Sequence, residues 1–161
     1  MAPAVPRVIG HAERTLSESV PGAPDDVRDF CVDPRSIASL HPEISIRRVP
    51  LIDPDDLGAQ EYRVSDALVV GFLTVPLRYS VSLRVPVAGA LTAEAHPMPT
   101  VRLEAVIAFE PIPAGTRLKE HLRISAPRPL LAVVARRVVA AHSVMLAGVR
   151  RHFETAGRPT G

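Results

Sequence analysis

The sequence has 161 residues, of which 47% are apolar, enough for one compact hydrophobic core and short for two. Nineteen Lys and Arg residues against seventeen Asp and Glu leave a net charge of only +2, so no strong basic field indicates nucleic-acid binding. Cys31 is the single cysteine and cannot form an internal disulfide, and neither a signal peptide nor an apolar run of about eighteen residues is evident. We therefore expect one soluble, cytoplasmic domain over residues 1–161, with mobile tails at 1–8 and 157–161.

The first predicted elements are a strand and two short helices. Residues His11–Val20 mix polar and apolar side chains as a strand does. The segment "PGAPDDVRDFCVD" then places a proline and two acids at a helix start, with Val27, Phe30 and Cys31 on one face. A second short helix is predicted from Pro34, and it must end before the next proline, which disfavours helical backbone in the residue preceding it.

From Ile44 onward the apolar side chains recur at every second residue, which predicts half-buried antiparallel strands. The segments "VPLRYSVSLRVP" and "RLEAVIAFEP" show this alternation most clearly. Further strands are predicted at Ser45–Ile52, Ala59–Val70, Leu91–His96 and Thr116–Ser125, separated by turns such as "DPDDLG", "HPMP" and "PIPAG". Counting the first, seven strands are expected.

The last predicted element is a long helix. Pro127 and Pro129 precede an uninterrupted helical stretch to about Ala156, which Gly157 ends, and its length is roughly 40 Å. Its apolar stripe comprises Leu131, Ala135, Val138, His142, Met145, Val149 and Phe153. We expect this stripe to lie on the concave face of the sheet, because no other predicted element is long enough to cover it.

The order strand, two short helices, six strands and long helix resembles the helix-grip fold of the START/Bet v 1 superfamily, particularly its bacterial polyketide cyclase/dehydrase and lipid-transport branch. The segment "SVPGAPDDVRDFCVDPRSIASLHPEI" looks like that family's passage from strand to helices, and "AHSVMLAGVRRHFE" looks like its terminal helix. The resemblance extends from about Ile9 to Glu154. It implies an α+β fold in which a curved, seven-stranded antiparallel sheet surrounds the last helix.

The resemblance also implies an elongated cavity between sheet and helix that takes sterols, lipids or polyketides. Strand alternation and the helix stripe supply the candidate ligand-binding residues, which are Tyr62, Tyr79, Leu103, Ile107, Val138, His142 and Met145. Members of the superfamily include carriers, sensors and cyclases, so the fold alone does not decide the function. No catalytic set of the cyclases can be matched position by position, and none is carried over.

Four inward-facing ionisable residues are predicted on the sheet, and two of them form a candidate pair; the four are Arg14, Glu18, Asp66 and Glu120. Glu120 lies between Leu118 and Leu122 on the inner face of the last strand, and Arg14 lies on the inner face of the first. Because these two strands neighbour each other in this fold, a diagonal Arg14–Glu120 pair is expected. The pair either fixes the sheet or lines the cavity, where Arg14 could anchor an oxygen and Glu120 could donate a proton.

His142 is the polar member of the helix stripe. It could hydrogen-bond a ligand or move a proton, or it could be a core histidine satisfied by a backbone carbonyl. The six histidines lack metal-ligand spacing, and no Cys-x-x-Cys, phosphate-binding glycine loop or Gly-x-Ser-x-Gly motif is present. We expect no metal, no cofactor and no bound nucleotide.

Three functions stay open at this point. The first is binding of a hydrophobic small molecule, lipid-like or polyketide-like, as a carrier or sensor. The second is a polyketide cyclase or dehydratase in which Arg14, Glu120, Tyr79 or His142 moves protons. The third is a protein-interaction module with a vestigial cavity. A monomer or a homodimer is compatible with each.

One predicted hairpin is unusual because its end is apolar. In "ALVVGFLTVPL", Gly71 is the expected turn, which leaves Val70, Phe72 and Leu73 at the tip. An exposed tip could touch a membrane, a carrier protein or a second copy of the chain. Alternatively, the start of the last helix, Pro129–Val134, could fold against the tip and bury both surfaces.

Overall fold

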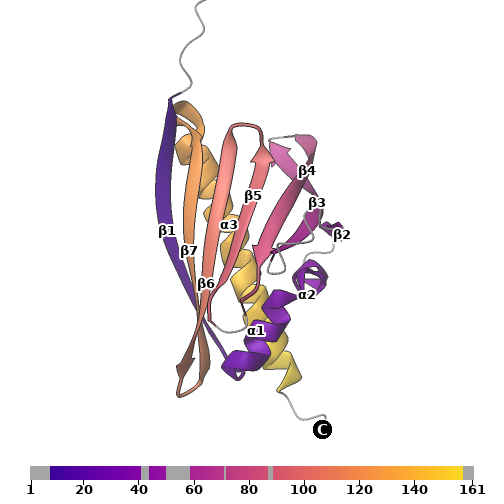
Figure 1. Cartoon of the computed structure of the whole chain (residues 1–161), viewed down its shortest axis with the longest axis vertical. Helices are drawn as coiled ribbons and strands as arrows, with labels where there is room; N and C mark the ends of the chain where they lie inside the picture. The colour runs from indigo at the N-terminus through magenta and orange to yellow at the C-terminus, as the bar shows by residue number, and fades with distance from the viewer. Residues whose placement is uncertain (1–7, 41–43, 50–58, 71, 87–88, 158–161) are drawn as a thin grey trace, which may run out of the picture.

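The computed structural model describes residues 8–40, 44–49, 59–70, 72–86 and 89–157. Strand β1 (Ile9–Val20) is followed by helices α1 (Pro24–Val32) and α2 (Pro34–Ser39). The remaining elements are β2 (Ser45–Val49), β3 (Ala59–Val70), β4 (Leu73–Arg84), β5 (Leu91–Met98), β6 (Val101–Ile112), β7 (Gly115–Pro127) and α3 (Arg128–Ala156). This order confirms the predicted helix-grip architecture (Figure 1).

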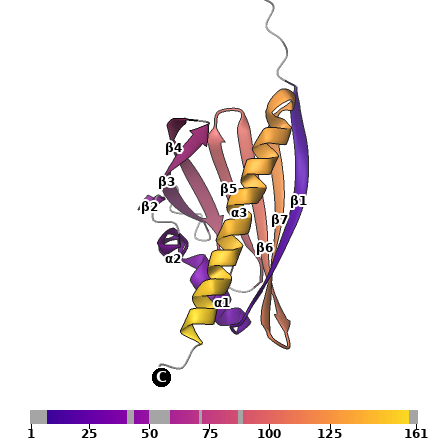
Figure 2. The ribbon, with the colours of Figure 1, turned by 180° about the vertical axis from the view of Figure 1, so that it is seen from behind.

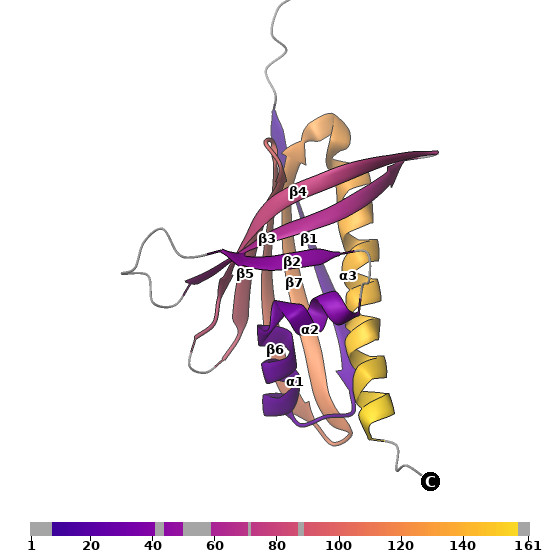
Figure 3. The ribbon, with the colours of Figure 1, turned by 90° about the vertical axis from the view of Figure 1, so that its right-hand side faces the viewer.

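The seven strands form one antiparallel sheet in the order β1-β7-β6-β5-β4-β3-β2. The first strand of the chain therefore pairs with the last, as expected, and β2 forms the opposite edge. The sheet is strongly curved, and β3 and β4 bend toward the side on which α3 lies (Figure 3). Because side chains alternate along each strand, one face of the sheet, here called the inner face, points toward α3.

Helix α3 crosses the inner face diagonally (Figure 2) and lies mainly against β1 and β7. Its predicted stripe is confirmed, because none of the seven stripe residues is exposed. Arg150 Nη1 donates to Glu18 Oε1 at 2.8 Å and so ties α3 to the edge strand β1. The helix ends at Gly157, whose N–H bonds to the carbonyl of Phe153.

A compact core joins one end of α3 to the two short helices. Its buried members are Val20, Val27, Leu118, Leu146 and Val149, and the predicted inward face of α1, with Phe30 and Cys31, packs against them. Gly148 allows α2 to approach α3, because a Cβ at this position would lie only 3.2 Å from the Leu40 side chain. This core fixes the register of α3 on the sheet.

Two sequence expectations need correction, and part of a third lies outside the described residues. Strand β5 runs through Pro97 to Met98 instead of ending at His96, and its pairing with β6 shifts between Ala95 and Met98. Pro97 has no N–H to give to the ladder, which fits a break in register. The sequence was not expected to contain an apolar segment of about eighteen residues. By length and composition alone, however, α3 is long and apolar enough to cross a membrane, with a mean hydropathy of 1.7 in an 18-residue window. Residues 50–52 of the predicted second strand lie outside the described residues.

Candidate functional site

The inner face is largely apolar and is not uniformly covered. Near β1 and β7, side chains such as Leu122 and Ile124 are fully buried beneath α3. Toward β4 and β6, the inward side chains of Tyr79, Val81 and Leu103 are only half-buried. Neighbouring inward side chains on these strands, among them Leu83, Leu91 and Ala105, are buried, so the incomplete cover is confined to a few positions.

One buried carboxyl–imidazole pair interrupts this apolar surface. Glu120, in the middle of β7, is 0% exposed, and its Oε1 lies 2.9 Å from Nδ1 of His142 on α3. The side chain of His142 is 21% exposed, so the imidazole connects the buried carboxylate with the edge of the helix. Sequence periodicity placed both residues between sheet and helix, and the structure confirms both orientations.

The surroundings of Glu120 are apolar on the sheet. Its neighbours across the strands are Leu16 on β1 and Ile107 on β6. Its second oxygen, Oε2, is buried and has no hydrogen-bond partner among the residues that the structure describes. A buried carboxylate oxygen without a partner is costly, so this atom requires an explanation.

Cys31 is a member of this environment that sequence reasoning missed. Burial, and secondarily the charge of Glu120, raise the pKa of the Cys31 thiol from 9.0 to about 12. The sequence placed Cys31 on the inward face of α1, but α1 and β7 are far apart in the chain. No periodic signal relates these two residues.

The predicted Arg14–Glu120 pair is wrong. Arg14 does project from the inner-face side of β1, opposite Leu122, but its side chain is exposed and its Nη1 donates to the Glu13 carbonyl at 2.7 Å. Since β1 is an edge strand, the long side chain of Arg14 reaches water at little cost in free energy. The structure thus gives Glu120 a histidine partner from the helix instead of an arginine from the sheet.

The two tyrosines lie on the inner face as predicted. Tyr62 is buried and its hydroxyl donates to Gln60 Oε1, so its polar group is already engaged within β3. Tyr79 on β4 is opposite Val64. Burial, and to a lesser extent the charge of Asp66, raise the pKa of the Tyr79 hydroxyl to about 12. Tyr79 is therefore a neutral hydroxyl at physiological pH.

The other predicted lining residues come from β6 and α3. Leu103 and Ile107 share the inner face of β6, and Val138 and Met145 lie on the stripe of α3; all four are half-buried. Ile107 and Met145 also pack against the core cluster near α1. The structure brings these residues to the same layer between sheet and helix.

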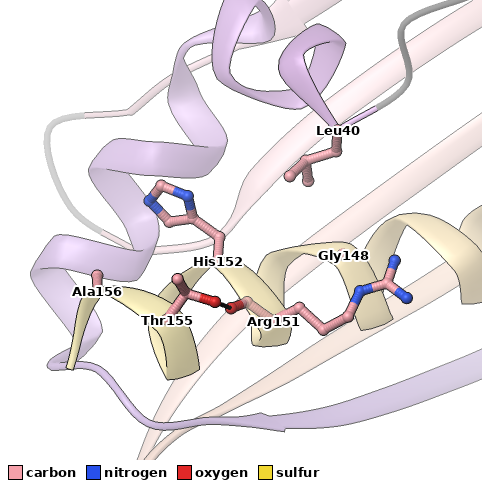
Figure 4. A pocket seen from close by; sticks show the side chains of 6 residues that line it. All are labelled: Leu40, Gly148, Arg151, His152, Thr155 and Ala156. Atoms are coloured by element: carbon pink, nitrogen blue, oxygen red, sulfur yellow. Dashed lines mark hydrogen bonds between the residues drawn. The ribbon is translucent and has the colours of Figure 1, made fainter. Parts of the chain in front are cut away.

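Two surface pockets lie elsewhere. The larger, of about 430 Å³, opens between the end of α2 and the C-terminal turns of α3, and Leu40, Arg151 and His152 contribute to its wall (Figure 4). The smaller, of about 240 Å³, lies beside the start of α1. Neither is lined by the predicted ligand-binding residues. Within the described part of the chain, no three His, Cys, Asp or Glu side chains gather as a metal site requires.

The apolar end of the β3–β4 hairpin is exposed. Phe72 is 96% and Leu73 57% exposed, whereas Gly71 lies outside the described residues. The alternative in which the start of α3 buries this tip is wrong, because Leu130 and Val133 are themselves about half exposed, at 49% and 51%. Figure 3 shows the hairpin projecting to the side on which α3 lies.

Comparisons with known proteins agree with this architecture. A family model described as "Polyketide cyclase / dehydrase and lipid transport" matches residues 11–154. Comparison with curated protein sequences finds no match. Similar solved structures include the Zhui aromatase/cyclase from Streptomyces sp. R1128, at 17% identity and a TM-score of 0.64, over 94% of this chain and 100% of that one.

Two further structures extend this comparison. The di-domain ARO/CYC BexL from the BE-7585A biosynthetic pathway is 16% identical with a TM-score of 0.72, over 92% of this chain and 51% of that one. Ara h 8.0201 is 13% identical with a TM-score of 0.68, and the match covers 91% of this chain and 99% of that one. Likeness at these identities shows the fold alone. Because the family model spans most of the sequence, the chain belongs to the polyketide cyclase / dehydrase and lipid transport family.

Proposed function

We propose that the protein binds a hydrophobic small molecule, lipid-like or polyketide-like, between the inner face of the sheet and α3. The observation that carries this proposal is the Glu120–His142 pair, a buried polar site on an otherwise apolar face. A few placed polar groups in an apolar environment are typical of small-molecule sites. The family description, which includes lipid transport, supports the same ligand class.

The half-buried residues indicate where the ligand would lie. Tyr79 on β4, Leu103 on β6 and Val138 on α3 come from three different elements, and each is only half-buried between sheet and helix. Burial of their remaining apolar surface by a ligand would favour binding by roughly 25 cal/mol per Å². We expect the ligand to contact these half-buried side chains and to reach the Glu120–His142 pair with its polar group.

A pair of tryptophan substitutions tests the proposal. The sequence has no Trp, so Val138→Trp places a single, bulky reporter on the inward side of α3. We expect this variant to fold cooperatively and to lose at least tenfold in affinity for the neutral apolar probe N-phenyl-1-naphthylamine. The matched control is Val144→Trp on the outward side of the same helix, where Val144 is 53% exposed. Undiminished binding by the Val138 variant would contradict the proposed location.

A second candidate function is acid–base catalysis at the same place. A carboxylate that orients an imidazole is an arrangement suited to proton transfer, and the folding of a poly-carbonyl chain needs such transfers. In this version His142 exchanges protons with the substrate, and Glu120 positions it. Arg14 has no part, since its guanidinium lies on the surface. Conversion of a poly-β-carbonyl thioester, lost in His142→Gln while N-phenyl-1-naphthylamine still binds, would favour the enzyme.

The third alternative, a protein-interaction module, predicts that neither probe binding nor turnover occurs.

The proposed setting is the cytoplasm, where the lone Cys31 would stay reduced. A binding protein of this kind must also receive and release its ligand. The exposed apolar end of the β3–β4 hairpin is a candidate contact surface for this exchange.

We further propose that the tip formed by Phe72 and Leu73 touches an anionic membrane during ligand exchange. No charged residue occurs from Ala67 to Leu77, and the tip projects on the side of α3. Helix α3 carries five arginines and no acidic residue before Glu154. An exposed apolar tip on the side of the molecule that carries an arginine-rich helix suits an anionic lipid surface.

A further inference from the structure

We infer that the ligand presents an O–H or N–H donor to Glu120 Oε2, and that anionic ligands such as fatty acids are disfavoured. This inference rests on the proposed function and specifies the chemistry of its ligand. It follows from a buried acceptor between sheet and helix, Glu120 Oε2, that has no hydrogen-bond partner among the described residues. The expected class comprises apolar phenols, enols and alcohols.

The geometry divides the carboxylate of Glu120 into two unequal oxygens. Oε1 is held by Nδ1 of His142 at 2.9 Å, which fixes the orientation of the group. Oε2 is buried and accepts no hydrogen bond from the described residues. An ionised carboxylate oxygen can only accept, so the complementary ligand atom must be a donor. A donor that reaches it gains a hydrogen bond to a charged group, which is among the stronger kinds.

Among the described residues, the two arginines on the inner-face side of β1 and α3 are already engaged by other groups. Arg14 points into solvent and donates to a backbone carbonyl. Arg150, the other inward-lying arginine on this side, donates through Nη1 to Glu18, while its buried Nε has no hydrogen-bond partner among the described residues. Cys31 is a neutral thiol, since its pKa is raised, and His142 is already paired with Glu120. A ligand carboxylate would therefore bring a second negative charge near Glu120 in apolar surroundings, which is unfavourable.

Four naphthalene derivatives of matched shape test this inference on the unmodified protein by calorimetry at pH 7. They are 1-naphthol, which donates, 1-methoxynaphthalene, which only accepts, 1-naphthoate, which is anionic, and 1-methylnaphthalene, which is apolar. We expect 1-naphthol to bind about tenfold more tightly than the methoxy and methyl compounds, and 1-naphthoate to bind most weakly. Equal affinities, or tighter binding of the methoxy compound or of naphthoate, would overturn the inference.

A pair of substitutions assigns the preference to Glu120. In Glu120→Gln the amide offers a donor as well as an acceptor, so the ratio of naphthol to methoxynaphthalene affinity should fall toward one. Glu18→Gln is the matched control, because Glu18 is also an inward-facing carboxylate but is bonded to Arg150; its ratio should not change. An unchanged ratio in Glu120→Gln would refute the assignment. If none of the four compounds binds, the proposed function itself fails, whereas binding without preference removes only the donor requirement.

Discussion

Removal of one partner of the Glu120–His142 pair should destabilise the protein more than removal of both. His142→Phe keeps an aromatic ring of similar size but deletes the nitrogen that faces Glu120 Oε1 at 2.9 Å. The carboxylate, of which only 1% of the side chain is exposed, is then left without any partner in the described residues. The double variant Glu120→Leu/His142→Phe removes the charge as well and leaves an apolar contact.

The expected magnitudes follow from burial. Breaking a buried pair costs about 3–5 kcal/mol, and the 21% exposure of His142 places this case near the lower end, at about 3 kcal/mol. Glu120→Leu leaves only a partly exposed imidazole and should cost about 1 kcal/mol. The double variant should lie close to the unmodified protein, since apolar replacement of a buried pair is often neutral. The coupling energy is therefore a few kcal/mol.

Urea unfolding followed by far-ultraviolet circular dichroism measures these free energies. The control is the Glu18–Arg150 pair, which has a similar distance of 2.8 Å but side chains that are 21% and 41% exposed. Its coupling should stay below about 1 kcal/mol, as for solvent-screened pairs. If the two single changes at Glu120 and His142 add within about 0.5 kcal/mol, the reasoning from a buried, coupled pair is refuted.

Three further outcomes are expected. Phe72→Ser with Leu73→Ser should change stability by less than about 0.5 kcal/mol, because both side chains are exposed, while association with anionic liposomes falls; a loss of several kcal/mol would refute exposure of the tip. Folding raises the pKa of the Tyr79 hydroxyl from 10.0 to about 12. The contribution of the neutral hydroxyl to stability is therefore complete below pH 10 and is lost as the pH rises to about 12. With two tyrosines and no tryptophan, ultraviolet difference absorbance detects this directly, and a full tyrosinate signal at pH 10.5 in the folded protein would contradict it. Cys31 should react with a disulfide reagent at pH 8 far more slowly in the folded than in the urea-unfolded protein, because its pKa is raised to about 12; equal rates would disprove its burial.

Local patterns in the sequence were sufficient to predict the elements. Alternation of apolar residues located β3 with the bounds Ala59–Val70, and proline and glycine placed the ends of α3 to within a residue. These signals are local, because a strand or helix reveals its own period regardless of what packs on it. Pro97 misled the prediction for β5, since a proline can also occupy an irregularity inside a strand.

The site was only half predictable. The periods showed that Glu120 and His142 both face inward, but not that they meet, because the position of α3 along the sheet depends on contacts such as Gly148 with Leu40. A cross-strand partner for Glu120 seemed available in Arg14. That pairing failed because an arginine on an edge strand can reach water and does not need a buried partner.

Methyl-resolved NMR during titration with 1-naphthol tests the central claim most directly, since it locates a bound molecule without relying on activity. We expect saturable shifts of the inward methyl groups of Leu103, Ile107 and Val138. The methyl groups of Val106 and Val144, which are exposed on the outer sides of the sheet and of α3, should stay unchanged. No saturable shift, or shifts confined to Val106, Val144 and the Leu73 tip, would contradict a ligand site between the sheet and α3.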